Sequence, residues 1–125
     1  MIKLSQEKVM LLHSLIIEKT GGNPNLRDEG LLNSALENAY QTFDGAELYP
    51  TVCEKAARIC YSLVSNHAFI DGNKRIGMLI LLTFLEINGA RICPSDSEII
   101  RIGLGLASGN VSYEMLLDWI LEQRS

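Results

Sequence analysis

The chain has 125 residues, of which 47% are hydrophobic and 21% are charged, as is usual for one compact globular domain. Its 15 acidic and 11 basic residues give a formal net charge of -4, which argues against a nucleic-acid-binding protein, because such proteins neutralise phosphates with Lys and Arg. The most apolar run, residues 78–87, is too short to span a bilayer. We therefore expect a single domain over residues 1–125, with no membrane and no direct nucleic-acid partner.

Three cysteines point to a reducing compartment. Cys53 and Cys60 fall on one predicted helix, about 10 Å apart along its axis, which is too far for a disulfide bond. No spacing of Cys and His residues matches a zinc site, and the N-terminal residues lack the long apolar core of a signal peptide. We expect a cytoplasmic protein in which Cys53, Cys60 and Cys93 are reduced and buried.

The N-terminal third predicts two helices. Ser5 is a good N-cap for the first helix, and the stretch "TGGNPN" at residues 20–25 ends it. The apolar residues that recur at helical spacing in the first helix are Val9, Leu12, Leu15 and Ile16. Asp28 can cap a second helix over residues 29–40. We expect Arg27 and Asp28 to act only as a cap and a salt bridge, and His13 to be a surface or partly buried residue rather than a ligand.

A short hairpin and a third helix follow. The Asp-Gly pair in "FDGAELYP", residues 43–50, predicts the hairpin. The helix over residues 51–66 buries an apolar stripe composed of Val52, Ala56, Ile59, Cys60 and Leu63. Continued by one step, this stripe reaches His67, so His67 is predicted on the core-facing side. Lys55 and Arg58 are predicted on the solvated face of the same helix.

Three further helices complete the predicted fold. Asn73 offers a cap for a helix over residues 74–88, which is apolar nearly all round and therefore belongs in the middle of a bundle. "SDSE" at residues 95–98 caps a fifth helix, and Ser112 caps a sixth that turns Trp119 inward. The predicted fold is all-α, a compact bundle of about six helices around a buried central helix, with a small β-hairpin.

The stretch "NHAFIDGNKR", residues 66–75, concentrates most of the groups that can move protons or bind phosphate. It precedes a helix N-terminus, where free backbone N–H groups and the helix dipole favour an anion. Gly72 allows close approach of a ligand to the backbone, and Lys74 and Arg75 add positive charge. The stretch can also be a polar turn between helices and nothing more, but its combination of residue types favours a phosphate site.

Two residues of this stretch suggest a reaction. The imidazole of a histidine such as His67 can act as a general base near neutral pH. Asp71 is a hard oxygen ligand of the kind that Mg²⁺ uses together with substrate phosphates. These are the parts that phosphoryl or nucleotidyl transfer needs. No Ser or Cys has the setting of an activated nucleophile, so we expect the attacking hydroxyl to come from the substrate.

"HAFIDGNKR", residues 67–75, resembles the motif of the death-on-curing (Doc) toxins, the short branch of the Fic superfamily. "RDEGLLNSAL" from residue 27 and "LEINGARI" from residue 85 resemble other helices of that family, so the likeness covers nearly the whole chain. The resemblance implies His67 as the general base, Phe69 as the anchor of the loop and Asp71 as the Mg²⁺ ligand. It further implies that Gly72, Asn73 and Lys74 cradle phosphate, with the Asn73 side chain taking part, and that Arg75 grips an outer phosphate.

Lys74 separates the two branches of the superfamily, since the longer branch has a second glycine there. In Doc-like members this lysine goes with transfer of the γ-phosphate of ATP to a Ser/Thr hydroxyl rather than transfer of AMP. The resemblance implies a protein kinase toxin that acts on elongation factor Tu and arrests translation. It also implies that "FDGAELYP" is a flap that aligns a target segment; a simple surface hairpin is the alternative.

The chain lacks the inhibitory pattern (S/T)xxxE(G/N) that restrains many Fic proteins. Glu is followed by Gly or Asn only at Glu29 and Glu37, and the residues four positions earlier are Asn25 and Asn33. We therefore expect restraint by an antitoxin whose disordered segment folds as a helix into a groove. The alternatives left open are AMP transfer to a protein hydroxyl, a non-catalytic phosphate- or nucleotide-binding module, and a phosphate hydrolase.

Overall fold

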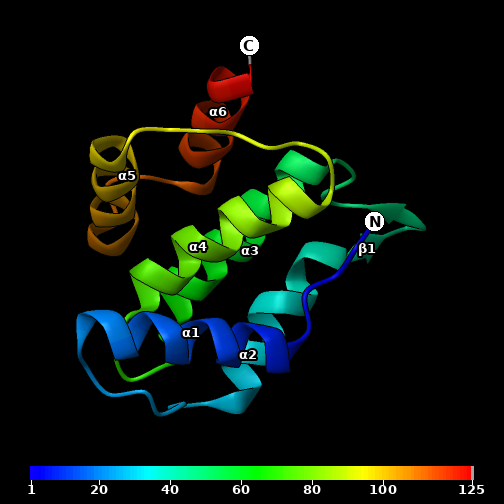
Figure 1. The fold of residues 1–125 in the computed structure, drawn as a ribbon. Helices are drawn as coiled ribbons and strands as arrows, with labels where there is room; N and C mark the ends of the chain where they lie inside the picture. Colours follow the sequence, from blue (N-terminus) through cyan, green and yellow to red (C-terminus); the bar gives the residue numbers. More distant parts are fainter. Residues whose placement is uncertain (125) are drawn as a thin grey trace.

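The computed structural model describes residues 1–124, and these form an all-α bundle with one small hairpin, as predicted (Figure 1). Ser125, the last residue of the predicted domain, lies outside the described residues. The elements in chain order are α1 (Gln6–Thr20), α2 (Glu29–Glu37), the 3-10 turn η1 (Asn38–Tyr40), β1 (Thr42–Phe43), β2 (Ala46–Glu47), α3 (Val52–Asn66), α4 (Asn73–Ile87), α5 (Asp96–Ser108) and α6 (Tyr113–Arg124).

Side-chain caps define where most helices begin. The predicted caps Ser5, Asp28 and Ser95 each accept a hydrogen bond from the backbone N–H three residues further on. Thr51 and Glu54 form a reciprocal capping box at the start of α3. Each such cap contributes about 1 kcal/mol to helix stability. These short-range signals explain why the helix starts agree with those expected from the sequence.

Helix α3 lies at the centre of the bundle, in contact with α2, α4, α5 and α6. It runs beside α4, and Gly77 makes the close approach possible, because a Cβ there would lie 2.6 Å from the Val64 side chain. The apolar helix predicted at residues 74–88 is α4, which packs against α1, α3 and α5, although the most central helix is α3. The α4 residues Leu79 and Leu82 are half-buried, and they pack against the core and also line a groove.

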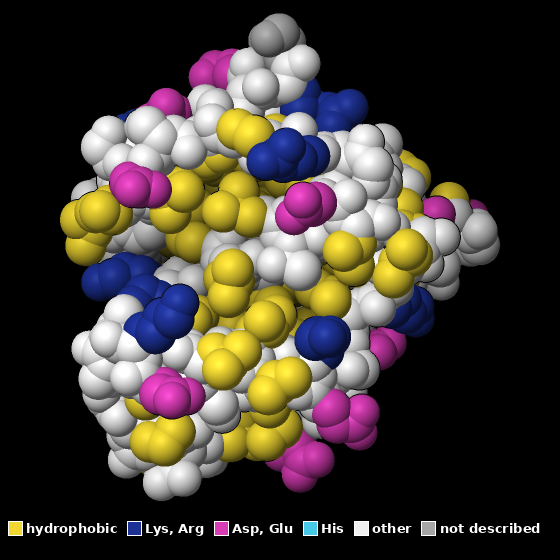
Figure 2. Space-filling model, viewed as in Figure 1, with side chains coloured by type: hydrophobic (Ala, Val, Ile, Leu, Met, Phe, Trp, Pro, Cys, Tyr) yellow, Lys and Arg dark blue, Asp and Glu magenta, His cyan; other side chains and the backbone are white. Residues whose placement is uncertain are grey.

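This groove runs between α1, α4 and α5 and has a volume of about 390 Å³. Figure 2 shows it as a hollow bordered by apolar side chains, with Lys and Arg side chains near it. Its walls include Ile16 of α1, Leu82 of α4 and the exposed Ile100 and Leu104 of α5. One end of the groove is formed by Lys74 and Arg75 of the motif. The groove therefore reaches the start of α4.

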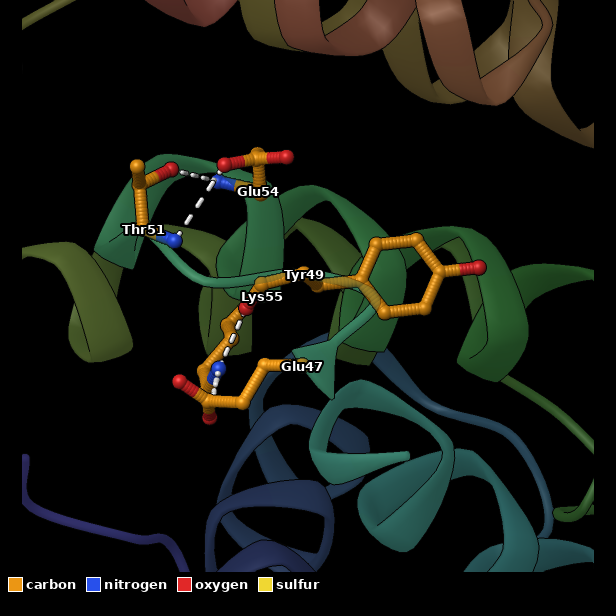
Figure 3. Close-up of polar contacts among 5 residues, drawn as sticks. All are labelled: Glu47, Tyr49, Thr51, Glu54 and Lys55. Atoms are coloured by element: carbon orange, nitrogen blue, oxygen red, sulfur yellow. Dashed lines mark hydrogen bonds and ion pairs between the residues drawn. The ribbon is translucent and has the colours of Figure 1, made fainter. Parts of the chain in front are cut away.

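The hairpin forms as predicted and is attached to the beginning of α3. Its strands pair antiparallel around Asp44 and Gly45, which both have positive φ. Lys55 is 2% exposed, and its Nζ donates to Glu47 Oε1 at 2.8 Å and to the Tyr49 carbonyl (Figure 3). The prediction that Lys55 lies on the solvated face of α3 is therefore wrong, because its partners come from the hairpin that folds over it.

Two further expectations concern exposure. Cys53 and Cys60 are buried as expected, but Cys93 is exposed, so the prediction for that thiol is wrong. Burial raises the pKa of the Cys60 thiol to about 12, which keeps it protonated and unreactive. Among the described residues, no helix is long and apolar enough to cross a membrane.

Candidate active site

The residues 67–72, which we call the motif loop, connect the end of α3 to the start of α4. His67 is the C-cap of α3 and has the left-handed dihedral angles φ 52° and ψ 50°. The backbone therefore leaves the helical path at this residue, and the side chain is exposed. The prediction that His67 continues the buried stripe of α3 is wrong, because the stripe holds only while the helix continues. Within residues 1–124 the imidazole makes no hydrogen bond, and it faces solvent.

The middle of the motif loop is buried. Ala68 is fully buried and Phe69 is 2% exposed. The Phe69 ring stacks on the His13 ring of α1, with the two centroids 3.7 Å apart and the planes inclined by 14°. This packing places the two ends of the loop, which carry His67 and Asp71, on the surface on either side of a fixed aromatic residue.

Asn73 shapes the loop from inside. Its side-chain oxygen accepts from the Phe69 N–H at 3.0 Å, and its side-chain nitrogen donates to the Phe69 carbonyl at 2.9 Å. The N-cap of α4 is Gly72, with φ 79°, so the prediction that Asn73 caps this helix is wrong by one residue. Gly72 has no side chain with which to cap, and in the described chain no other side chain caps this start. The first N–H groups of α4 therefore remain available to an anion.

Asp71 is held from two directions. Its Oδ2 accepts from the Asn23 N–H at 2.7 Å, and its carbonyl oxygen lies 2.7 Å from His13 Nε2, which donates to it. The side chain itself is exposed. Residues 1–124 contain no cluster of three or more His, Cys, Asp or Glu that would by itself hold a metal ion. One oriented carboxylate beside an uncapped helix N-terminus fits Mg²⁺, which takes its other ligands from substrate phosphates and water.

Two cations lie at the first turn of α4. Lys74 is exposed, while Arg75 is half-buried and donates from Nη1 to Thr20 Oγ1 of α1. Together with Gly72, Asn73 and Ala107 of α5, they line a hollow of about 180 Å³. The positive end of the α4 dipole and these two side chains all favour negative charge in that hollow.

His13 belongs to this site, although its position in the sequence predicts only a surface or partly buried residue. It is fully buried and lies beneath the motif loop, where its Nδ1 has no hydrogen-bond partner within residues 1–124. Burial lowers the pKa of His13 below its ordinary value. The signal that could have found it is the spacing of four between Val9, His13 and Ile17, the three buried residues of α1.

Arg27 also belongs to the site. Its Nε donates to the His67 carbonyl at 2.7 Å and its Nη2 to the Asn66 carbonyl at 3.0 Å. The expected salt bridge to Asp28 is absent from the described part of the chain, whereas the expected cap by Asp28 is present. No local signal could have found Arg27, because its partners lie about forty positions away in the sequence.

The hairpin lies at the opposite end of α3 from the motif loop (Figure 1). The twelve residues from Lys55 to His67 correspond to about 18 Å along the helix axis. This separation favours the simple surface hairpin over a flap that aligns a target beside His67.

Comparison with known proteins agrees with this description. The model of the Fic/DOC family matches residues 3–85, which is more than half of the chain. The chain belongs to the Fic/DOC family. It is 39% identical over 98 residues to "Toxin Doc" of Mycolicibacterium smegmatis, and this alignment covers 78% of this chain and 72% of that protein. It is also 29% identical over 115 residues to "Protein kinase doc" of Escherichia phage P1, covering 92% and 90% of the two chains.

Proposed function

We propose that this chain is the toxin of a toxin–antitoxin pair and transfers the γ-phosphate of ATP to a serine or threonine hydroxyl of a protein. The observation that carries the proposal is the exposed imidazole of His67 at one end of a loop whose other end leads into an uncapped helix N-terminus with Lys74 and Arg75. The similarity to proteins named as a Doc toxin and as a Doc protein kinase supports it.

In the proposed reaction, His67 accepts the proton of the target hydroxyl. The hydroxyl oxygen then forms a bond to the γ-phosphorus, the bond from that phosphorus to the β–γ bridging oxygen breaks, and ADP leaves with the electron pair. His67 suits this role because its ring is exposed, while its backbone is fixed by the end of α3. Correct placement of the base and the phosphate supplies most of the acceleration in such reactions.

The chain's own groups would hold the phosphates. The free N–H groups at the start of α4 would bind phosphate oxygens, with Gly72 allowing close approach. Arg75 has one guanidinium nitrogen on Thr20, which orients the other toward the hollow, where an outer phosphate would bind. The amide of Asn73 is used by Phe69 in this structure, so we assign its contribution to the shape of the loop.

We assign Asp71 as the carboxylate that would hold Mg²⁺ against the phosphates. When bound, Mg²⁺ would neutralise the charge that develops on the phosphate oxygens. The bond from the Asn23 N–H to Oδ2 leaves the other carboxylate oxygen for the ion. Lys74 adds charge where the longer branch of the superfamily has bare backbone, and this favours γ-phosphate transfer over AMP transfer.

We further propose elongation factor Tu as the target, with arrest of translation in the cytoplasm as the result. An antitoxin helix would occupy the groove between α1, α4 and α5, since a groove with apolar walls suits one face of an amphipathic helix. Because the groove ends at Lys74 and Arg75, its occupant would also block phosphate binding. Leu104→Glu should then weaken inhibition by the antitoxin without loss of transfer, while Leu121→Glu on α6, equally exposed, should change neither.

The test of the activity uses a bacterial lysate with Mg²⁺ and ATP labelled at either the γ or the α position. The proposal predicts one protein band labelled only from the γ position, and no band with the His67→Ala variant. A band labelled only from the α position would assign AMP transfer instead. Release of free phosphate without a labelled protein would indicate a hydrolase, and nucleotide binding without any product would indicate a binding module.

A further inference from the structure

We infer that Arg27 is a positioning residue, which holds His67 in its left-handed conformation and so directs the imidazole toward the target hydroxyl. This inference rests on the proposed function of His67. Arg27 does not touch the imidazole or the phosphate hollow; it contacts the backbone on both sides of the His67 nitrogen.

The two hydrogen bonds of Arg27 act on the last turn of α3. Nε reaches the His67 carbonyl at 2.7 Å and Nη2 reaches the Asn66 carbonyl at 3.0 Å. The carbonyls at a helix C-terminus have no partners within the helix, and they carry its negative partial charge, so a guanidinium suits them. Because the guanidinium is planar and rigid, bonds to two successive carbonyls fix the orientation of two successive peptide planes.

His67 needs such support. A residue with a side chain is strained at φ 52°, and it stays there only where its surroundings hold it. Asparagine and glycine are the residues that usually occupy this position at the end of a helix. The conformation determines the direction of the Cα–Cβ bond and hence of the ring. Loss of the Arg27 side chain should therefore release the ring from its working direction.

Arg27 is itself held in a fixed frame. The N–H groups of Arg27 and Asp28 both donate to the Ala68 carbonyl, at 2.7 and 3.0 Å, and the Ile70 N–H donates to the Asn25 carbonyl at 3.2 Å. Leu26 forms an antiparallel bridge with Phe69. These backbone bonds do not depend on the Arg27 side chain, and Arg27 is exposed. A substitution should therefore change the direction of His67 without unfolding the protein.

The first arm of the test measures the reaction in full-length Arg27→Ala and Arg27→Lys variants. We expect Arg27→Ala to lower kcat for γ-phosphate transfer about tenfold to a hundredfold, the effect of misplacing a catalytic group, with the affinity for ATP within about threefold. Arg27→Lys should be intermediate, since lysine lacks the rigid fork. Guanidinium ion at low, non-denaturing concentration should restore part of the Arg27→Ala activity. Arg91→Ala, which removes only an exposed ion pair to Glu86, is the control.

The second arm needs no reaction. The chain has only two histidines, so a sample labelled with ¹³C-histidine gives two Cα signals. The signal of His13, which lies within helix α1, serves as an internal reference. The His67 Cα shift should move in Arg27→Ala, return on addition of guanidinium, and stay unchanged in Arg91→Ala. An unchanged His67 shift, or a kcat equal to that of wild type, would overturn the inference, as would parallel losses of kcat, ATP affinity and Tm without rescue. If the wild-type protein transfers no phosphate, the proposed function fails, and the NMR arm alone decides whether Arg27 positions His67.

Discussion

One of the two histidines of the chain lies beneath the motif loop, and the other is its first residue. His13 is fully buried beneath the loop, with its ring stacked on Phe69 and bonded to the Asp71 carbonyl. His67 lies at the exposed end of the loop on a left-handed helix cap. The same residue type therefore supports the backbone in one place and faces solvent in the other. Their surroundings, rather than their chemistry, separate the two roles.

Replacing His67 should give the largest effect. His67→Ala removes the proposed base and leaves the proposed phosphate site, so transfer should fall by about a hundredfold or more, with the affinity for ATP changed only a few-fold. The measurement is the rate of γ-label transfer, together with ATP titration. Because His67 is exposed and strained, the melting temperature should not decrease.

The matched control is His13→Gln, which keeps a donor below the loop and should retain most of the transfer activity. If His67→Ala kept full activity, or if His13→Gln were the inactive variant, the assignment of the two histidines would have to be reversed.

Replacing His13 by leucine should mainly reduce stability. His13→Leu fills the space but leaves the Asp71 carbonyl without its donor, which should cost about 1–3 kcal/mol of unfolding free energy. Urea unfolding of His13→Leu and His13→Gln measures the difference between a lost donor and a replaced donor. Equal stabilities of these two variants would show that the hydrogen bond to Asp71 contributes nothing.

Replacing Lys74, which is exposed in the first turn of α4, should have a smaller effect. Lys74→Gly should reduce γ-phosphate transfer by about fivefold, the value of one exposed ionic contact, and should allow some label to come from the α position. Lys74→Ala controls for the backbone freedom that glycine introduces at the start of α4. Unchanged products in both variants would show that Lys74 does not determine which phosphate is transferred.

The smallest expected effect is a dependence of stability on pH. Burial lowers the pKa of His13 in the folded state below the ordinary value of 6.5, so the unfolded chain binds more protons as the pH falls below that value. The stabilisation is therefore complete above about pH 6.5 and is lost as the pH falls through the folded-state pKa. Urea midpoints at about pH 7.5 and about pH 5.5 should differ less in His13→Gln than in wild type. An equal difference in both proteins would contradict this.

Much of the fold could be predicted because its signals are local. Ser5, Asp28 and Ser95 cap their helices through contacts three residues away, and the turn residues Asp44 and Gly45 make the hairpin. The motif residues were likewise visible as a group, because they are consecutive in the sequence. The features that the sequence predicts correctly are therefore those that depend on interactions within a few residues of each position.

The remaining features depend on contacts between one element of the fold and another. The sequence predicts Lys55 as a surface residue, because it does not show that the chain around the hairpin folds over Lys55 and that Glu47 and Tyr49 accept its hydrogen bonds. Helical spacing predicts His67 on the core-facing side, but its left-handed backbone places it on the surface, and the Arg27 side chain that binds its carbonyl comes from a distant part of the sequence. The roles of His13 and Arg27 follow only from the folded chain, in which α1 and the segment that precedes α2 pack against the motif loop and the end of α3.

The central claim is that His67 promotes transfer of a phosphoryl group to a protein hydroxyl. The most direct test is intact-mass spectrometry of purified elongation factor Tu after incubation with Mg²⁺, ATP and either the wild-type protein or His67→Ala. The account predicts a mass gain of one phosphoryl group with the wild-type protein and none with the variant. A gain of an adenylyl group, or the same gain with both proteins, would contradict it.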